Sequence, residues 1–324
     1  MFTIDDLRAA TEVVRRVVPP TPQYQWPLLS ARLGPGVEAW VKHENATPAG
    51  AFKVRGGLVY VDRLVRDRPD VRGLISATRG NHGQSIAIAG VRAGLPVTIV
   101  VPFGNSPDKN AAMRAWGAEL IEHGRDFQEA REHAAALAGE RGLEMVPSFH
   151  PDLVLGVATY ALELFEAVSD LDAVYVPIGM VSGACGLMAA RNALGLSTEI
   201  VGVVASAAPA TALSFDAGHV VCTDDADTFI DGVACRVPDP TAIELIIAGC
   251  ARVVQVGEDQ CAEAMRVLLE TTHQMPEPAG AVATAAMLLE ADRLAGTRVA
   301  TIMTGGNLDA HLLRDVLAGR TPTA

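Results

Sequence analysis

Short apolar, β-branched runs alternate along this chain with longer alanine-rich runs of helical character. The short runs predict strands and the long runs predict helices, because buried strands rarely exceed eight or so residues whereas helices usually exceed ten. Strands are predicted at 73–78, 96–101, 118–123, 173–178, 199–204 and 298–303. Helices are predicted near 81–94, 107–117, 126–141, 152–168, 183–195, 258–272 and 279–294.

This strand–helix alternation is typical of parallel sheets with right-handed crossovers and helices on both faces. Three strand–helix units lie within 73–149, and a second series runs from 173 to the end. We therefore predict an α/β protein in which a smaller lobe is inserted into a larger one. The large domain is predicted at 1–46 and 150–324, and the small domain at 47–149.

Composition narrows the possible partners and the compartment. The chain has 324 residues, 49% of them apolar, and a formal net charge of −12. An acidic chain without a basic run argues against binding to nucleic acid or a membrane surface. No apolar run reaches the roughly 18 residues of a membrane span, and the N-terminus does not resemble a signal peptide. The five cysteines form no C-x-x-C pair, which favours a reduced, cytoplasmic protein.

Unusual residues follow the predicted strands. Ligands of open α/β sheets bind at the carboxyl ends of the strands, so these segments are candidates for a site. They read SATRGNHGQS (76–85), PIGMVSGACG (177–186) and TGGNLD (304–309), and HENATPAGAFKVRGG (43–57) follows the run VEAWVKHE.

The glycine-rich turn after 173–178 is suited to an anion. Small residues let backbone N–H groups converge, the helix that follows adds its dipole, and Ser182 can donate a hydroxyl hydrogen bond. A phosphate is the natural ligand; a tight turn with glycines for packing alone is the alternative. The turn matches neither the P-loop nor the Gly-x-Gly-x-x-Gly pattern.

Lys53 stands between Phe52 and Val54, with glycines at 50, 56 and 57. Most lysines are solvated surface charges, and that reading stays open for Lys53. A partly desolvated lysine, however, has a lowered pKa and can form a Schiff base. A Schiff-base lysine and a phosphate turn together indicate pyridoxal 5′-phosphate (PLP) as the cofactor.

Six segments in order resemble the fold-type II PLP enzymes, specifically the serine/threonine dehydratase and serine racemase family. They are PPTPQYQWPLLS, AFKVRGG, TRGNHGQ, GMVSG, EPAGA and TGGNLD, and they extend from about Pro19 to Asp309. The resemblance implies a tryptophan synthase β-like fold with two open parallel-sheet lobes. It places the active site between those lobes and PLP on the large domain.

The resemblance also implies roles for individual residues. Lys53 would bind the cofactor covalently and shuttle the α-proton, Phe52 would flank the ring, and Asn81 would hydrogen-bond the 3′-oxygen. Thr304 would face the pyridine nitrogen, or would only cap a turn at the strand end. Glu277 would belong to the cofactor site, or would only be an acid at a helix N-terminus. The phosphate would be held by Gly179, Met180, Val181, Ser182 and Gly183.

The turn at 76–82 would bind the α-carboxylate of an amino acid. Its candidate substrate-binding residues are Ser76, Thr78, Arg79, Gly80, Asn81 and His82. Racemase-like members of the family carry a serine base where this chain has Arg79. A guanidinium is a poor base, so we expect weak or absent racemisation. Arg79 could pair with the α-carboxylate or with a second acid group of the substrate, or could point outward toward Asp108 or Glu119.

The metal site of some racemase-like relatives is not expected here. Those relatives use two carboxylates where this chain has Ala205 and Thr211, and a hard divalent cation would lack ligands. A homodimer is what the resemblance implies for assembly.

These features predict a PLP-dependent ammonia-lyase (dehydratase), a carbon–oxygen lyase of the L-serine/L-threonine dehydratase type. It would convert a 3-hydroxy amino acid to a 2-oxo acid and ammonium. Serine, threonine, 3-hydroxyaspartate and phenylserine all remain open as substrates. The alternatives are a racemase or β-replacement enzyme of the same fold, or a non-catalytic protein that binds a phosphate ligand.

Overall fold

The computed structural model describes residues 2–323 and contains two sheets. The six-stranded sheet has the order β1 (Gln23–Gln25), β2 (Glu38–His43), β10 (Arg298–Met303), β7 (Ala173–Pro177), β8 (Glu199–Ala205) and β9 (Arg252–Val256). The four-stranded sheet has the order β5 (Glu119–Glu122), β4 (Val97–Val101), β3 (Leu74–Ala77) and β6 (Glu144–Met145). All pairings are parallel except that of β1 with β2. The α/β fold class with parallel sheets is therefore confirmed.

The helices fall between the strands, as the alternation predicted. The first group comprises α1 (Ile4–Arg15), α2 (Pro27–Leu33), α3 (Lys53–Asp67), α4 (Asn81–Arg92), α5 (Pro107–Ala115) and α6 (Phe127–Arg141). The second comprises α7 (Pro151–Ala167), α8 (Ser182–Ala193), α9 (Ala210–Ala217), α10 (Pro240–Gly249), α11 (Glu258–Thr272), α12 (Pro278–Leu289) and α13 (Ala310–Leu317). Three short 3₁₀ turns are η1 (Glu44–Ala46), η2 (Asp231–Val233) and η3 (Ala291–Arg293).

Both faces of the six-stranded sheet are covered by helices. Along β7, Val174 and Val176 pack with the core formed by α7 and α8, whereas Ala173 and Tyr175 pack with the core formed by α2, α11 and α12. Because side chains alternate across a strand, one continuous apolar run supplies two cores.

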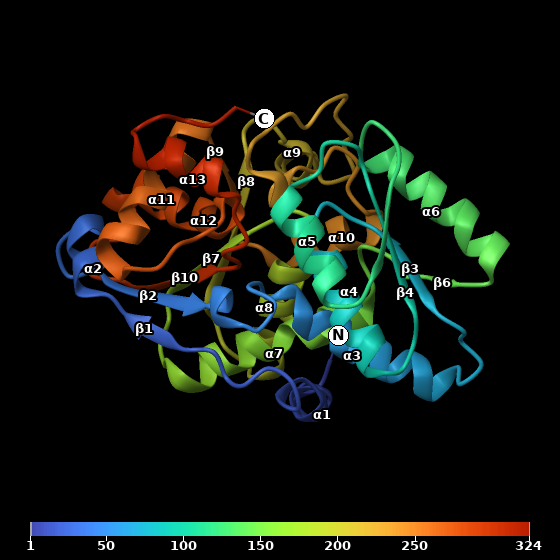
Figure 1. Ribbon diagram of the computed structural model, residues 1–324. Helices are drawn as coiled ribbons and strands as arrows, with labels where there is room; N and C mark the ends of the chain where they lie inside the picture. The colour runs from blue at the N-terminus through green and yellow to red at the C-terminus, as the bar shows by residue number, and fades with distance from the viewer. Residues whose placement is uncertain (1, 324) are drawn as a thin grey trace.

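The four-stranded sheet lies beside the large one, on the right of Figure 1. Helix α6 covers one of its faces through Ala130 and Ala134, which pack on Ile75 and Val100. Helix α4 covers the other face, where Ile99 belongs to the main core. This sheet falls wholly inside the predicted small domain, and the domain boundaries themselves stay a prediction.

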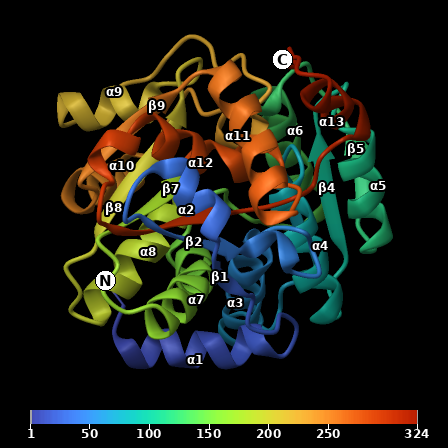
Figure 2. The ribbon, with the colours of Figure 1, turned by 90° about the vertical axis from the view of Figure 1, so that its left-hand side faces the viewer.

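The N-terminal segment joins the larger part of the molecule. Strands β1 and β2 extend the six-stranded sheet next to β10. Helix α1 runs along the bottom of Figure 2 and packs against α7 and α3. A capping box between Thr3 and Asp6 starts this helix. Among residues 2–323, no helix has the length and the unbroken apolar character needed to cross a bilayer.

The strand register brings the candidate segments to one edge. Met303 of β10 pairs with His43 of β2, and Thr301 pairs with Tyr175 of β7. The chain therefore leaves these three neighbouring strands on the same side of the sheet, into the segments beginning at 44, 178 and 304.

Candidate functional site

One pocket at this edge collects the residues predicted to bind the cofactor. All ten of them line it: Phe52, Lys53, Asn81, Gly179, Met180, Val181, Ser182, Gly183, Glu277 and Thr304. Pro177, Gly232 and Ala279 complete the lining. Residues from six distant parts of the sequence therefore meet around a single space.

The turn at 179–183 has the geometry of an anion site. Val181 has φ 65° and is the N-cap of α8, so its backbone lies in the left-handed region that β-branched residues avoid. Such strain is kept where the surrounding structure imposes it, commonly at a ligand site. The hydroxyl of Tyr160 donates to the Gly183 carbonyl at 3.1 Å and fixes the first turn of α8. Ser182 and Gly183 line the pocket, so the N-terminal end of α8 adjoins it, which suits a phosphate.

Lys53 is the first residue of α3, and its backbone is tied on both sides. Its carbonyl accepts a hydrogen bond from Ser85 Oγ at 2.6 Å, and the N–H of Phe52 donates to the Thr304 carbonyl at 2.9 Å. Its Nζ lies 5.1 Å from the centre of the Phe52 ring. Burial lowers the pKa of Lys53, and the attraction of Glu277 offsets this only in part. The amine is therefore more readily deprotonated than a surface lysine.

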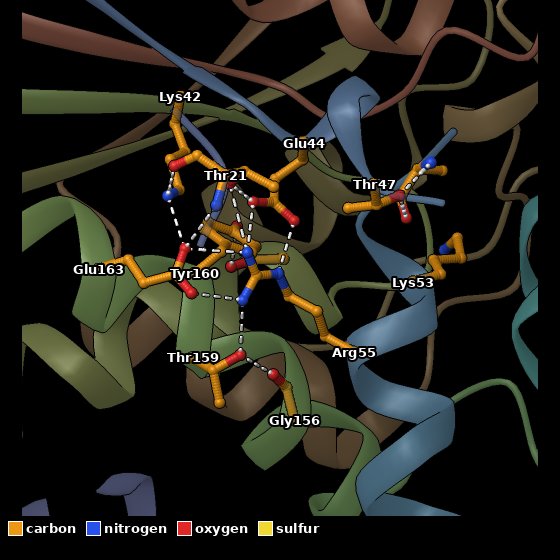
Figure 3. A network of polar contacts seen from close by, with 12 residues as sticks. Thr21, Lys42, Glu44, Thr47, Lys53, Arg55, Gly156, Thr159, Tyr160 and Glu163 are labelled. Atoms are coloured by element: carbon orange, nitrogen blue, oxygen red, sulfur yellow. Dashed lines mark hydrogen bonds and ion pairs between the residues drawn. The ribbon is translucent and has the colours of Figure 1, made fainter. Parts of the chain in front are cut away.

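A buried ionic network lies two residues further along α3 (Figure 3). The Arg55 guanidinium donates to both carboxylate oxygens of Glu44, at 2.8 and 3.0 Å. It also donates to both oxygens of Glu163 of α7, each at 2.9 Å. Arg55 and Glu44 are fully buried, and the Glu163 side chain is 6% exposed.

Lys42 and Thr21 complete this network. Lys42 donates to Glu163 Oε2 at 2.7 Å, to the Thr21 carbonyl and to Gln23 Oε1, which uses all three of its protons. Two cations and two carboxylates balance, so the charged groups are mutually compensated. The start of α3 is thereby fixed to β2, η1 and α7, and the Lys53 backbone is fixed with it.

Glu277 connects the pocket to the turn before α4. Its Oε1 accepts from Asn81 Nδ2 at 2.6 Å, and Asn81 Oδ1 accepts from Asn307 Nδ2 at 2.8 Å. A Cβ at Gly305 would collide with the Glu277 carboxylate, which explains a glycine in TGGNLD. Burial raises the pKa of Glu277 to about 7, although Lys109 opposes the shift. Within residues 2–323 its buried Oε2 has no hydrogen-bond partner.

The predicted substrate turn is formed, but its members differ in position. Ser76 lies in β3 and donates its hydroxyl to the Val146 carbonyl, and the Gly80 N–H donates to Thr78 Oγ1. Arg79 is exposed, forms no ion pair with any residue in 2–323 and does not line the pocket. Their roles in substrate binding stay predictions.

His82 begins α4 next to Asn81. Burial lowers its pKa to about 3, with Lys53 adding to the shift. Its buried Nε2 has no hydrogen-bond partner among the described residues. The imidazole is therefore neutral at physiological pH. His82 does not line the pocket, so its role in substrate binding stays a prediction.

An ion pair that the sequence motifs did not reveal lies next to the site. Lys109 Nζ lies 2.5 Å from Asp231 Oδ2, and Asp231 directly precedes the pocket residue Gly232. One signal in the sequence could have drawn attention to it. Lysines occur only at 42, 53 and 109, among 26 basic residues, and two of the three are buried ion-pair partners.

The positions of the family's metal ligands hold no carboxylate. Ala205 ends β8 and Thr211 is buried in α9. In the part of the chain that is described, no three His, Cys, Asp or Glu side chains gather into a metal site. That the protein needs no metal stays a prediction.

The pocket fits pyridoxal phosphate. An aldehyde requires an amine of lowered pKa, which Lys53 provides. A phosphate is favoured at the N-terminus of a helix, and the 179–183 turn brings the start of α8 to the same pocket. Glu277 lines the pocket, and its Oε2, which lacks a hydrogen-bond partner among the described residues, offers a polar contact to a further ligand atom.

Comparison with known proteins gives consistent matches. The sequence model of the family described as pyridoxal-phosphate dependent enzyme matches residues 14–305. The L-threonine ammonia-lyase of Thermotoga maritima is 31% identical over 98% of this chain and 78% of its own length. The L-threo-3-hydroxyaspartate ammonia-lyase of Saccharomyces cerevisiae is 30% identical over 98% of this chain and 97% of its own. Threonine deaminase isoform 2 from Solanum lycopersicum superposes with a TM-score of 0.88 at 28% identity, covering 98% and 94%.

Proposed function

The chain belongs to the family of pyridoxal-phosphate dependent enzymes, and on that premise we propose how its own residues carry out an ammonia-lyase reaction. Its cofactor is pyridoxal 5′-phosphate, and its class is that of a carbon–oxygen lyase, as the two similar ammonia-lyases indicate. When bound, the cofactor stabilises the negative charge that develops at the substrate α-carbon.

The substrate is a 3-hydroxy amino acid. The reaction breaks the bond from the α-carbon to hydrogen and the bond from the β-carbon to oxygen, so that water leaves. The released enamine tautomerises to an imine, and water then hydrolyses it to a 2-oxo acid and ammonium, which restores the balance of atoms. Relatives named for threonine and for 3-hydroxyaspartate are almost equally similar, which supports these two substrates. Serine and phenylserine are the other candidates that the sequence leaves open.

Lys53 would hold the cofactor through its aldehyde, and the Lys53 amine would remove the α-proton of the substrate. Its fixed backbone and lowered pKa suit both tasks, because only the flexible side chain has to move. The 179–183 turn would hold the phosphate, Asn81 and Glu277 would contact the ring, and Thr304 would offer a neutral hydroxyl to it; all of these residues line the pocket. The turn at 76–82 binds the α-carboxylate. The racemase activity is expected to be weak, because Arg79 replaces the second base.

One observation carries this proposal: Lys53 and the phosphate turn line the same pocket. PLP added to the purified protein should produce visible absorbance, and borohydride should then fix the cofactor to the peptide containing Lys53. Lys42 and Lys109 are the matched controls, since they are the only other lysines. Labelling of either of them, or unchanged absorbance in Lys53→Ala, would contradict the assignment.

A second assay separates a lyase from a binding protein. Release of 2-oxo acid should be measured with serine, threonine, 3-hydroxyaspartate and phenylserine. If Arg79 binds a second acid group of the substrate, Arg79→Ala should selectively slow the reaction with 3-hydroxyaspartate. An unchanged order of preference would remove that role. A homodimer and a cytoplasmic location belong to the same proposal, and sedimentation of the holoenzyme tests the first.

A further inference from the structure

Lys109 connects the two sheets beside the active-site pocket. It lies in the first turn of α5, which packs on α4 and β5 of the four-stranded sheet. Its partner Asp231 lies in η2, which packs on α12, a helix that covers the six-stranded sheet. The side chains are only 10% and 28% exposed, so this ion pair is largely shielded from water and salt.

A second contact fixes the same end of α5. Ser106, the N-cap of α5, donates its hydroxyl to Asp309 Oδ1 at 2.7 Å and accepts the Lys109 N–H at 3.1 Å. Asp309 is the N-cap of α13 and ends the TGGNLD segment. The start of α5 is therefore tied to both η2 and α13.

The methylene stem of Lys109 lies against the predicted substrate turn. A Cβ placed on Gly80 would stand 2.5 Å from Lys109 Cδ and 3.2 Å from Cγ. Gly80 is the N-cap of α4, directly before Asn81. A shift of the stem would therefore be felt by the backbone that is expected to bind the α-carboxylate.

The Lys109 amine stays protonated at physiological pH. Burial by itself would lower its pKa, but Asp231 and then Glu277 outweigh that effect and raise the pKa above the usual value. Asp231 therefore faces a cation at any physiological pH. The compact ammonium and its straight stem fit beside Gly80, whereas a planar guanidinium is bulkier. This fits the presence of a lysine in a chain whose other basic residues are almost all arginine.

We propose that the Lys109–Asp231 ion pair is a latch that holds the turn at 78–82 against the six-stranded side of the pocket. Lys109 is thus a positioning residue: it acts on the substrate carboxylate through the backbone of Gly80. The kinetic consequence rests on the proposed ammonia-lyase function, whereas the structural consequence does not.

The structural consequence is tested by hydrogen exchange on the PLP-loaded protein. Lys109→Met and Asp231→Asn should each speed amide exchange in the peptide covering 76–85 by about tenfold or more, as expected when a contact of about 1.4 kcal/mol is lost. Arg63→Met is the matched control, because it breaks a 2.6 Å ion pair between α3 and Asp152 of α7, away from this turn. Exchange in 76–85 should not change in this control.

The kinetic test uses whichever candidate substrate the wild type turns over. Lys109→Met should raise KM about tenfold or more and change kcat less, since binding of the carboxylate is weakened in ground and transition states alike. Reversing the pair with Lys109→Glu and Asp231→Lys together should restore part of the loss that each single change causes. Thermal melting of each variant checks that it folds. The double variant Lys109→Met/Asp231→Asn removes both charges of the ion pair, so that neither partner is left unpaired.

The outcomes separate the two proposals. If no substrate gives a 2-oxo acid, the proposed function fails, yet faster exchange at 76–85 still supports the latch. If exchange at 76–85 is unchanged in both single variants, or rises equally in Arg63→Met, the latch is refuted. Changes in exchange spread over the whole chain would mean that Lys109 is only a structural residue, which also overturns the proposal.

Discussion

Replacing Arg55 by methionine tests how the protein tolerates charge in its interior. The change keeps the apolar stem and removes the guanidinium that serves Glu44 and Glu163 at 2.8–3.0 Å. Lys42 is then the only cation left in the network; it donates a hydrogen bond to Glu163, whereas it attracts Glu44 only through its charge. Glu44, fully buried, is left with the Thr21 hydroxyl as its hydrogen-bond donor.

The size of the stability loss follows from the two protonation states open to a buried carboxylate. Glu44 must remain charged in a medium of low polarity or take up a proton. Protonating a carboxyl of ordinary pKa, about 4.3, costs about 4 kcal/mol at pH 7, at about 1.4 kcal/mol per pH unit. Breaking a buried ion pair from one side typically costs about 3–5 kcal/mol, so the two routes agree. We expect the free energy of unfolding to fall by about 4 kcal/mol.

The way in which the stability loss changes with pH is a second, independent test. In the variant, the folded-state pKa of the unpaired carboxyl is raised above its unfolded value. Stability tied to that proton is present at low pH and is lost as the pH rises. The penalty of Arg55→Met should therefore shrink from about 4 kcal/mol at pH 7 to about 1 kcal/mol at pH 5.

Urea unfolding followed by circular dichroism measures both quantities. Arg55→Met/Glu44→Gln should recover at least half of the loss, because the pair of Lys42 and Glu163 then remains balanced. Arg125→Met, at an exposed pair with Glu129, should leave the midpoint unchanged. A penalty below about 1 kcal/mol at pH 7, or one that is equal at pH 5 and pH 7, would refute the reasoning.

Two further predictions concern the pocket and the helix packing. Burial raises the pKa of Glu277 to about 7, so the apo protein should lose roughly 3 kcal/mol of stability between pH 4.5 and pH 7. The Glu277→Gln variant should not show this loss. Urea unfolding of both proteins at the two pH values measures the difference, and equal losses would contradict the prediction. Gly156→Ala should destabilise the protein by about 1–3 kcal/mol, because the added Cβ would overlap the Arg55 carbonyl and lie 2.7 Å from Gly56 Cα. Gly139→Ala in α6 is the control: its Cβ would meet nothing within 4 Å, so this change should stabilise the protein by about 0.5–1 kcal/mol. Equal effects of the two changes in thermal melting would contradict this.

Periodicity predicted the strands that carry the core. Every predicted strand is present within one or two residues, and the seven predicted helices are confirmed. Four strands, β1, β2, β6 and β9, were not predicted, and in β2 the apolar residues are interrupted by Glu38 and Lys42. β1 and β6 have three and two residues, and β9 contains Arg252 and Gln255. Their pairing partners, which lie far away in the sequence, decide that they are strands.

The cofactor site was accessible to sequence reasoning because its chemistry is local. A phosphate needs small residues at a helix start, and a Schiff base needs a lysine with apolar neighbours. Each signal is contained in one short segment. Lys109 and Asp231 lacked any such signal, since they are 122 residues apart and contact each other only when the two sheets come together.

The sequence by itself determined the kind of protein: a doubly covered parallel α/β fold, a lysine, a phosphate turn and therefore a cofactor. Only the tertiary structure decided the electrostatics. The network around Arg55, the raised pKa of Glu277 and the shielded Lys109–Asp231 pair all depend on burial and on charges that different elements bring together. A side chain's type gives its charge, but the surroundings set the free energy of that charge, and those surroundings exist only in the folded chain.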